Sequence, residues 1–184
     1  MMFSNEDIKH AVRTGELVIE PFKEDWIRAA GITMHLGAEL LKPLSGCIVD
    51  VKKRVVPEHQ KIDISQAPYT LAPGEFVLGH TYQKVSVGPS LGFLIEGRST
   101  LARVGLTIVQ TAMLVYPGHR NRTVTLELAN HGPNPIVLHY KMKIARVALI
   151  ELKTPASEMY DDTGKYRFQE SVGEPIFDSE ILED

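Results

Sequence analysis

Short runs in which apolar and polar residues alternate recur along most of the chain, and turn residues separate them. The clearest run is 124–128, where Val124, Leu126 and Leu128 alternate with Thr125 and Glu127. A period of two places the three apolar side chains on one face of a strand and the two polar ones on the other. Strands are predicted at 17–19, 76–78, 83–87, 91–96, 107–109, 123–128, 136–138 and 145–151.

Two segments carry helix signals instead. Ser4 precedes an acidic first turn and Gly15 follows a basic last turn, which predicts a helix over about 5–13. A second, short helix is predicted at about 99–103 and ends before Gly105. Because turn signals recur about every eight to twelve residues around the short strands, the chain is predicted to be a β-barrel or jelly roll interrupted by one short helix.

Two polar stretches fall outside the strand pattern. Residues 51–65 are rich in charge, and we interpret them as a solvated surface loop rather than a binding patch. After Pro155 the chain becomes polar and contains glycine, which suits a lid that closes over a site. We therefore expect one domain over 1–184, with 156–184 as a C-terminal lid or tail.

Composition narrows the class of protein. A chain of 184 residues with 43% hydrophobic residues can bury one core without disulfides. The net charge of -3 provides no general basic surface, so nucleic-acid binding is not expected. The single cysteine, Cys47, rules out a disulfide within the chain and favours a reducing, cytoplasmic location. No apolar run approaches the roughly 18 residues that span a bilayer, so no membrane role is expected.

The same cysteine count bears on metal chemistry. Zinc-dependent deaminases hold their metal with a C-x-x-C pair and a further His or Cys, which one cysteine cannot provide. The seven histidines show no close spacing that suggests another zinc site. Any deamination by this chain is therefore expected to proceed without zinc.

The segment 97–130 holds the residues with the clearest chemistry. In GRSTLARVG, Gly97 permits close backbone approach, Arg98 offers a planar fork for phosphate, and Ser99 and Thr100 bring hydroxyl groups to the start of the short helix. This is a candidate phosphate site. Glu127, a lone carboxylate among apolar neighbours, is a candidate general base.

These motifs resemble the dCTP deaminase branch of the dUTPase superfamily. The similarity rests on GRSTLARVG, on TA at Thr111, on PG at Pro117, and on TLELAN ending at Asn130. It extends to SNEDIKHAVRTGELVIEPF, LAPGEFVLGHTYQKV, KMKIARV and GKYRFQE. The resemblance implies a dUTPase-like distorted β-barrel or jelly roll, which assembles as a homotrimer with sites at the subunit interfaces.

The resemblance also implies an activity, deamination of dCTP to dUTP and ammonia. Glu127 takes the place of the general base that activates water, Ser99 helps to hold that water, and Arg103 orients the carboxylate. Substrate contacts carry over to Arg98, Thr100, Ala112, Tyr116, Tyr160, Lys165 and Gln169. Mg²⁺ is expected to arrive on the triphosphate, without metal ligands from the protein.

Without the resemblance, each of these residues has a structural interpretation as well. Ser99 can be a helix cap, and Arg103 can be a cation that compensates the helix dipole. Glu127 can be an exposed residue on the polar face of its strand. The segment around Lys165 can be a solvated tail.

Several positions depart from the family pattern. Tyr116 stands where the family has the Asp that binds the sugar and that serves as the base in dUTPases, so phosphate hydrolysis is disfavoured. His119 replaces an aromatic residue, Asn121 a Gly, Val109 a frequent His and Arg146 a Gln. These changes leave other functions open: a bifunctional dCTP deaminase and dUTPase that forms dUMP and pyrophosphate, a plain dUTPase, a regulatory nucleotide-binding module, or a purely structural barrel.

Overall fold

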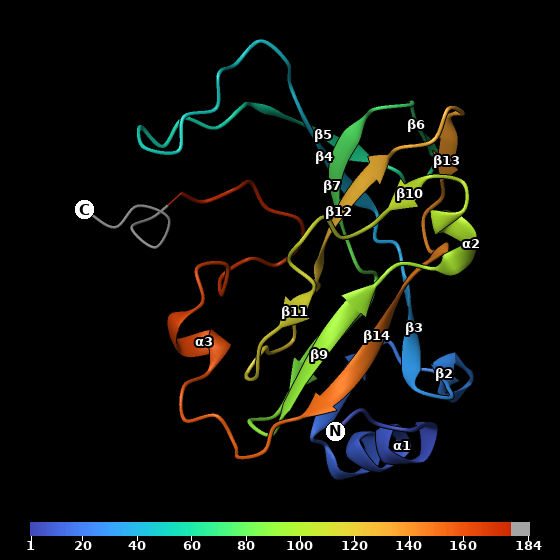
Figure 1. Ribbon diagram of the computed structural model, residues 1–184, viewed down its shortest axis with the longest axis vertical. Coiled ribbons are helices and arrows are strands. Elements are labelled where there is room, and N and C mark those ends of the chain that lie inside the picture. Colours follow the sequence, from blue (N-terminus) through green and yellow to red (C-terminus); the bar gives the residue numbers. More distant parts are fainter. Residues whose placement is uncertain (178–184) are drawn as a thin grey trace.

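The computed structural model describes residues 1–177 (Figure 1). Its helices and strands are, in chain order, α1 (Asn5–Thr14), β1 (Leu17–Glu20), η1 (Glu24–Trp26), β2 (Ile27–Arg28), β3 (Gly31–His35), β4 (Glu39–Pro43), β5 (His59–Asp63), β6 (Tyr69–Leu71), β7 (Phe76–His80), β8 (Lys84–Val87), β9 (Leu91–Glu96), α2 (Ser99–Ala102), β10 (Leu106–Thr107), β11 (Leu114–Val115), β12 (Thr125–Asn130), β13 (Ile136–Leu138), β14 (Lys143–Glu151) and α3 (Tyr160–Thr163). The mainly β fold class, with an N-terminal helix and a short internal helix, is confirmed.

Two five-stranded antiparallel sheets form the body of the fold. One has the order β10-β12-β7-β4-β5 and the other β11-β9-β14-β3-β2. Two smaller pairs, β1-β8 and β13-β6, complete it. Figure 1 shows β9 and β14 side by side, with the pair β12 and β7 above them in this view. The tail after β14 turns back toward β11, and its Tyr160 N–H donates to the carbonyl of Pro117, just after that strand.

The core lies where the apolar faces of the strands meet. In β12, Leu126 and Leu128 are fully buried while Thr125 and Glu127 are half-buried, as the alternation predicts. Phe93 of β9 is also buried in this core. Because the apolar face of β12 packs inward, the side chain of Glu127 is held on the opposite face.

Helix α1 closes one end of the body. The Ser4 side chain accepts from the backbone N–H of Asp7, whose carboxylate accepts in turn from the Ser4 backbone, and Gly15 ends the helix with φ 78°. Ile8 and Ala11 are buried against the strands. The predicted helix limits and both caps are confirmed to within one residue.

Other expectations need correction. The stretch 51–65 is not only a loop, because it contains β5, which pairs with β4 at the edge of its sheet. An edge strand needs no continuous apolar side, which explains its polar sequence. The strand expected at 107–109 ends at Thr107. The tail expected at 156–184 includes the short helix α3, and its residues 178–184 lie outside the described part of the chain.

Helix α2 is held against the body by two glycines. Gly105 has φ +92°, and a Cβ placed on it would lie 2.2 Å from the backbone nitrogen of Gly132. The backbone N–H of His131 donates to the Gly105 carbonyl over 2.8 Å. This direct approach of two backbone segments sets the position of the loop that follows α2.

Candidate functional site

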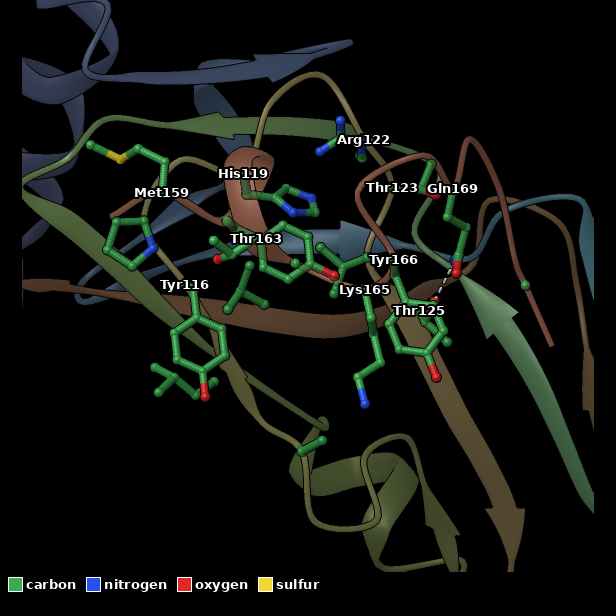
Figure 2. A pocket seen from close by; sticks show the side chains of 18 of the residues that line it. Tyr116, His119, Arg122, Thr123, Thr125, Met159, Thr163, Lys165, Tyr166 and Gln169 are labelled. Atoms are coloured by element: carbon green, nitrogen blue, oxygen red, sulfur yellow. Dashed lines mark hydrogen bonds between the residues drawn. The ribbon is translucent and has the colours of Figure 1, made fainter. Parts of the chain in front are cut away.

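The described part of the chain has a large cavity of about 820 Å³ between the segment around β11, the strand β12 and the C-terminal tail. Figure 2 shows its side chains, with Tyr116 and His119 on one side and Thr125 and Gln169 on the other. Nucleotide-sized ligands occupy cavities of this volume, roughly 300–1,000 Å³. The pocket is therefore large enough for a nucleoside triphosphate.

Six of the ten residues predicted for the site line this pocket. They come from three parts of the chain: the segment around β11, the strand β12, and the tail. They are Ala112, Tyr116, Glu127, Tyr160, Lys165 and Gln169. The tail is thus part of the cavity wall.

Glu127 projects from the outward face of β12. Its Oε2 atom accepts a hydrogen bond of 2.7 Å from the backbone N–H of Gln110. Its backbone is anchored too, because Glu127 lies opposite Leu78 and its N–H donates to Ile108. Within residues 1–177, the second carboxylate oxygen, Oε1, has no hydrogen-bond partner. One oxygen orients the carboxylate and the other can accept a proton.

The other four predicted residues lie elsewhere. Ser99, Thr100 and Arg103 are exposed at α2, and Arg98 is half-buried just before it. None of the four lines the pocket. No ion pair joins Arg103 to Glu127 within the described chain. The structure therefore does not bring the helix residues to Glu127 within one copy of the chain.

Two arginines near α2 have buried nitrogen atoms without partners in the described residues: Arg98 Nη1 and Arg146 Nε. Arg146 of β14 lies opposite Glu96, two residues before Arg98. A buried guanidinium N–H that makes no hydrogen bond is costly, and phosphate oxygens are acceptors that suit it. Two buried guanidinium donors without partners in the described residues therefore lie close to α2.

Several contacts hold the tail over the pocket. The Gln169 amide donates to the Thr125 hydroxyl over 2.8 Å, as the dashed line in Figure 2 marks. The Arg122 guanidinium pairs with Asp161 of α3, and both side chains are largely buried. Val172 is 8% exposed. The tail is therefore anchored on both sides of the segment that contains Lys165.

Tyr160 packs into the pocket from the tail. Its ring is stacked with that of Tyr116, with centroids 6.5 Å apart and an interplanar angle of 6°. Its backbone N–H donates to the Pro117 carbonyl over 2.9 Å. Burial raises the pKa of the Tyr160 hydroxyl above its usual value. Tyr160 is thus neutral at physiological pH and can serve as a hydrogen-bond donor.

His119 and Arg122 also line the pocket, although the sequence pattern did not predict them as site residues. His119 is 7% exposed, and its Nε2 atom is buried without a partner in the described chain. The only signal in the sequence was that His119 stands where the resembled family has an aromatic residue. Nothing local indicated Arg122, because its partner Asp161 lies 39 residues away.

Within 1–177, no three His, Cys, Asp or Glu side chains come together as a possible metal site. No helix in that range is long and apolar enough to cross a membrane. The predicted absence of zinc stays a prediction.

Comparisons with known proteins agree with these features. Residues 2–152 match the family model described as dCTP deaminase-like. A dCTP deaminase of Natronomonas pharaonis is 33% identical over 180 residues, which cover 94% of this chain and 92% of that protein. A protein of Corynebacterium diphtheriae named dCTP deaminase, dUMP-forming, is 33% identical over 163 residues and 87% of each chain.

A solved structure is also similar. The crystal structure of 2'-deoxycytidine 5'-triphosphate deaminase from Agrobacterium tumefaciens superposes with a TM-score of 0.61 at 14% identity. The match covers 80% of this chain and 47% of that one, so this chain spans about half the length of that protein. At this identity the likeness shows the fold alone, and it agrees with the mainly β fold that the sequence predicts.

Proposed function

The chain belongs to the dCTP deaminase-like family, and we propose that it deaminates dCTP to dUTP and ammonia. The observation that carries this proposal is the position of Glu127 in the wall of a nucleotide-sized pocket, with one carboxylate oxygen held and the other available. Five further residues expected to contact the substrate line the same cavity.

In the proposed reaction, Glu127 removes a proton from a water molecule, and the resulting hydroxide attacks C4 of cytosine. The attack leaves a negative charge on N3 of the tetrahedral intermediate, and the amino group leaves as ammonia after Glu127 gives it the proton. The proton of the new C4 hydroxyl group then moves to N3, which gives the keto form of uracil. The carbonyl oxygen of uracil comes from the water, so dCTP and water give dUTP and ammonia. The Gln110 N–H on Oε2 fixes the direction in which Oε1 can take the proton.

The triphosphate is the second element of the proposal. Lys165 and Gln169 of the tail line the pocket and suit phosphate oxygens, and Tyr160 can donate its hydroxyl proton. Mg²⁺ bound to the triphosphate would neutralise part of its charge, held by phosphate oxygens and water rather than by a cluster of carboxylates. Closure of the tail would exclude water from the phosphates.

We propose that the active protein is a homotrimer whose sites lie between subunits. Ser99, Thr100 and Arg103 are exposed on one copy, away from the pocket that contains Glu127. The unpaired Arg98 Nη1 suits a phosphate supplied from outside its own chain. In a ring of three copies, α2 of one chain would complete the pocket of the next. A cytoplasmic location stays a prediction.

The test is incubation of purified protein with dCTP and Mg²⁺, followed by chromatography of the nucleotides. We expect dUTP as the product. Glu127→Gln should lower kcat by about 10²–10⁴-fold, with the dissociation constant for dCTP changed less than about threefold, because general acid–base catalysis is lost while the shape is kept. Glu151→Gln, at an exposed carboxylate of β14, is the matched control.

The alternatives give different results in the same assay. Formation of dUMP and pyrophosphate would identify the bifunctional enzyme. The dUMP-forming name of the Corynebacterium relative favours this activity, whereas Tyr116 in place of Asp disfavours it. Tight binding of dCTP without turnover would contradict the proposed catalysis and indicate a regulatory nucleotide-binding module. A wild type and a Glu127→Gln variant with equal turnover would exclude Glu127 as the base.

A further inference from the structure

His119 occupies a protected place in the pocket wall. Its backbone carbonyl accepts from the N–H of Val87 over 2.9 Å, which fixes the residue at the end of β8. The ring of Tyr160 lies against it, with centroids 5.8 Å apart, and Phe93 meets it edge to face at 6.5 Å. The imidazole is therefore held by packing and has little freedom to rotate.

The state of the ring follows from its surroundings. Burial lowers the pKa of His119, while a hydrogen bond to the Arg122 backbone raises it; the charge of Arg122 lowers it and that of Asp161 raises it. The net shift is downward, so the ring is neutral at neutral pH. Nε2 has no partner in the described chain, so Nδ1 is the donor to the Arg122 carbonyl, and in this tautomer Nε2 carries the lone pair and is an acceptor. In the described chain that acceptor has no partner.

The chemistry of dCTP limits what could meet this acceptor. Its phosphates accept hydrogen bonds, so its neutral donors are the amino group on C4 and the 3′-hydroxyl. The amino group is at the reacting carbon, which must lie beside Glu127. Glu127 lies opposite Leu78 of β7, whereas the backbone carbonyl of His119 is hydrogen-bonded to Val87 at the end of β8. The two residues are therefore held by different strands. The 3′-hydroxyl is the donor that remains.

We propose that His119 recognises the sugar, with Nε2 accepting a hydrogen bond from the 3′-hydroxyl of dCTP. The inference rests on the proposed function, because it takes dCTP as the ligand. It also gives a reason for Tyr116 in the place of a sugar-binding Asp: Tyr116 is 57% exposed and stacks on Tyr160, and His119 supplies the lost acceptor. Tyr160 covers His119, so the tail must shift for the sugar to enter.

The experiment compares dCTP with 2′,3′-dideoxy-CTP, which lacks only the hydroxyl in question. For the wild type, kcat/KM should be about tenfold higher with dCTP, the effect of one hydrogen bond. In His119→Phe, which keeps an aromatic ring of similar size, the ratio should fall to within about twofold of one. His119→Gln, whose amide oxygen can accept, should restore part of the preference. His139→Phe, at an exposed histidine, should keep the wild-type ratio.

Different outcomes separate the two proposals. If His119→Phe leaves the ratio of kcat/KM for dCTP to kcat/KM for 2′,3′-dideoxy-CTP at its wild-type value, the role of His119 is overturned. This holds even if both rates fall, because a merely structural defect lowers kcat/KM for both substrates alike. Absence of turnover in the wild type would count against the deaminase proposal alone. In that case calorimetry would measure the dissociation constants of the two nucleotides for the wild type and for His119→Phe. The inference would be overturned if the ratio of these constants were the same in both proteins, or if the wild type bound neither nucleotide.

Discussion

Replacing Gly105 with alanine should destabilise the protein through the contact that holds α2. The residue has φ +92°, a conformation that L-residues avoid at a cost of about 1–2 kcal/mol. The added Cβ would also lie 2.2 Å from the nitrogen and 2.5 Å from the Cα of Gly132. The added Cβ would meet backbone atoms, which cannot rotate away as a side chain can. The clash could therefore be relieved only if the two backbone segments moved apart.

The expected size of the effect follows from these two costs. Overpacking of a closely packed site costs about 1–3 kcal/mol, so the total loss should be about 2–5 kcal/mol. Gly74 provides the matched control, since it has φ +75° with nothing within 4 Å of the added Cβ. Gly74→Ala should cost only the conformational part, about 1–2 kcal/mol.

Urea unfolding followed by circular dichroism measures both free energies of unfolding. Gly105→Ala should be less stable than Gly74→Ala by at least about 1 kcal/mol, which corresponds to about 2–4 °C in Tm for a chain of this size. Deaminase activity under folding conditions should also fall, because α2 begins at Ser99 and ends beside Arg103. Equal stability of the two variants would show that the approach of Gly105 to Gly132 is not a tight contact.

Two further predictions concern pH and assembly. Burial is the main cause that lowers the pKa values of His35, His80 and His119 below 6.5, so the unfolded chain binds protons more readily than the folded one. Stability should therefore be complete only well above pH 6.5 and decline as the pH falls through that value, by up to about 1.4 kcal/mol per pH unit for each histidine. Urea unfolding at pH 7.5, 6.5 and 5.5 measures this change. A stability that stays level over this range would contradict the burial of neutral histidines. Mixing Arg103→Ala with Glu127→Gln subunits under exchange should restore about one quarter of wild-type activity, because one pairing in four joins an intact α2 to an intact carboxylate. A mixture no more active than its parents would show that the two residues do not act across an interface.

Local patterns in the sequence predicted the elements whose signals are local. Ser4 and Gly15 mark the ends of α1, and the alternation around Glu127 gives β12 its inward and outward faces. β3 was missed because all five of its residues are buried, which removes the alternation. β5 was missed for the opposite reason, since an edge strand keeps polar residues on both faces.

The site was predictable only in part. The motifs identified Glu127 and the tail residue Gln169, which the structure brings into one pocket. The Arg122–Asp161 pair depends on how the tail folds back, which no short pattern encodes. The acceptor on His119 was equally hidden, because it arises from burial and from the bond to the Arg122 backbone. Nor can the spacing of residues tell whether Arg103 acts in its own chain or in a neighbour.

The contact between Gly105 and Gly132 also limits how this protein can change during evolution. In an ordinary core, a larger residue at one position can be offset by a smaller one at its neighbour. Here a Cβ on Gly132 would lie 2.4 Å from the Val104 carbonyl, and one on Gly105 would meet the Gly132 backbone. No amino acid is smaller than glycine, so a larger residue at one of these positions cannot be offset by a smaller residue at the other. A lineage can alter this junction only by rebuilding the loop after α2, and every such change would also displace the helix that carries Ser99.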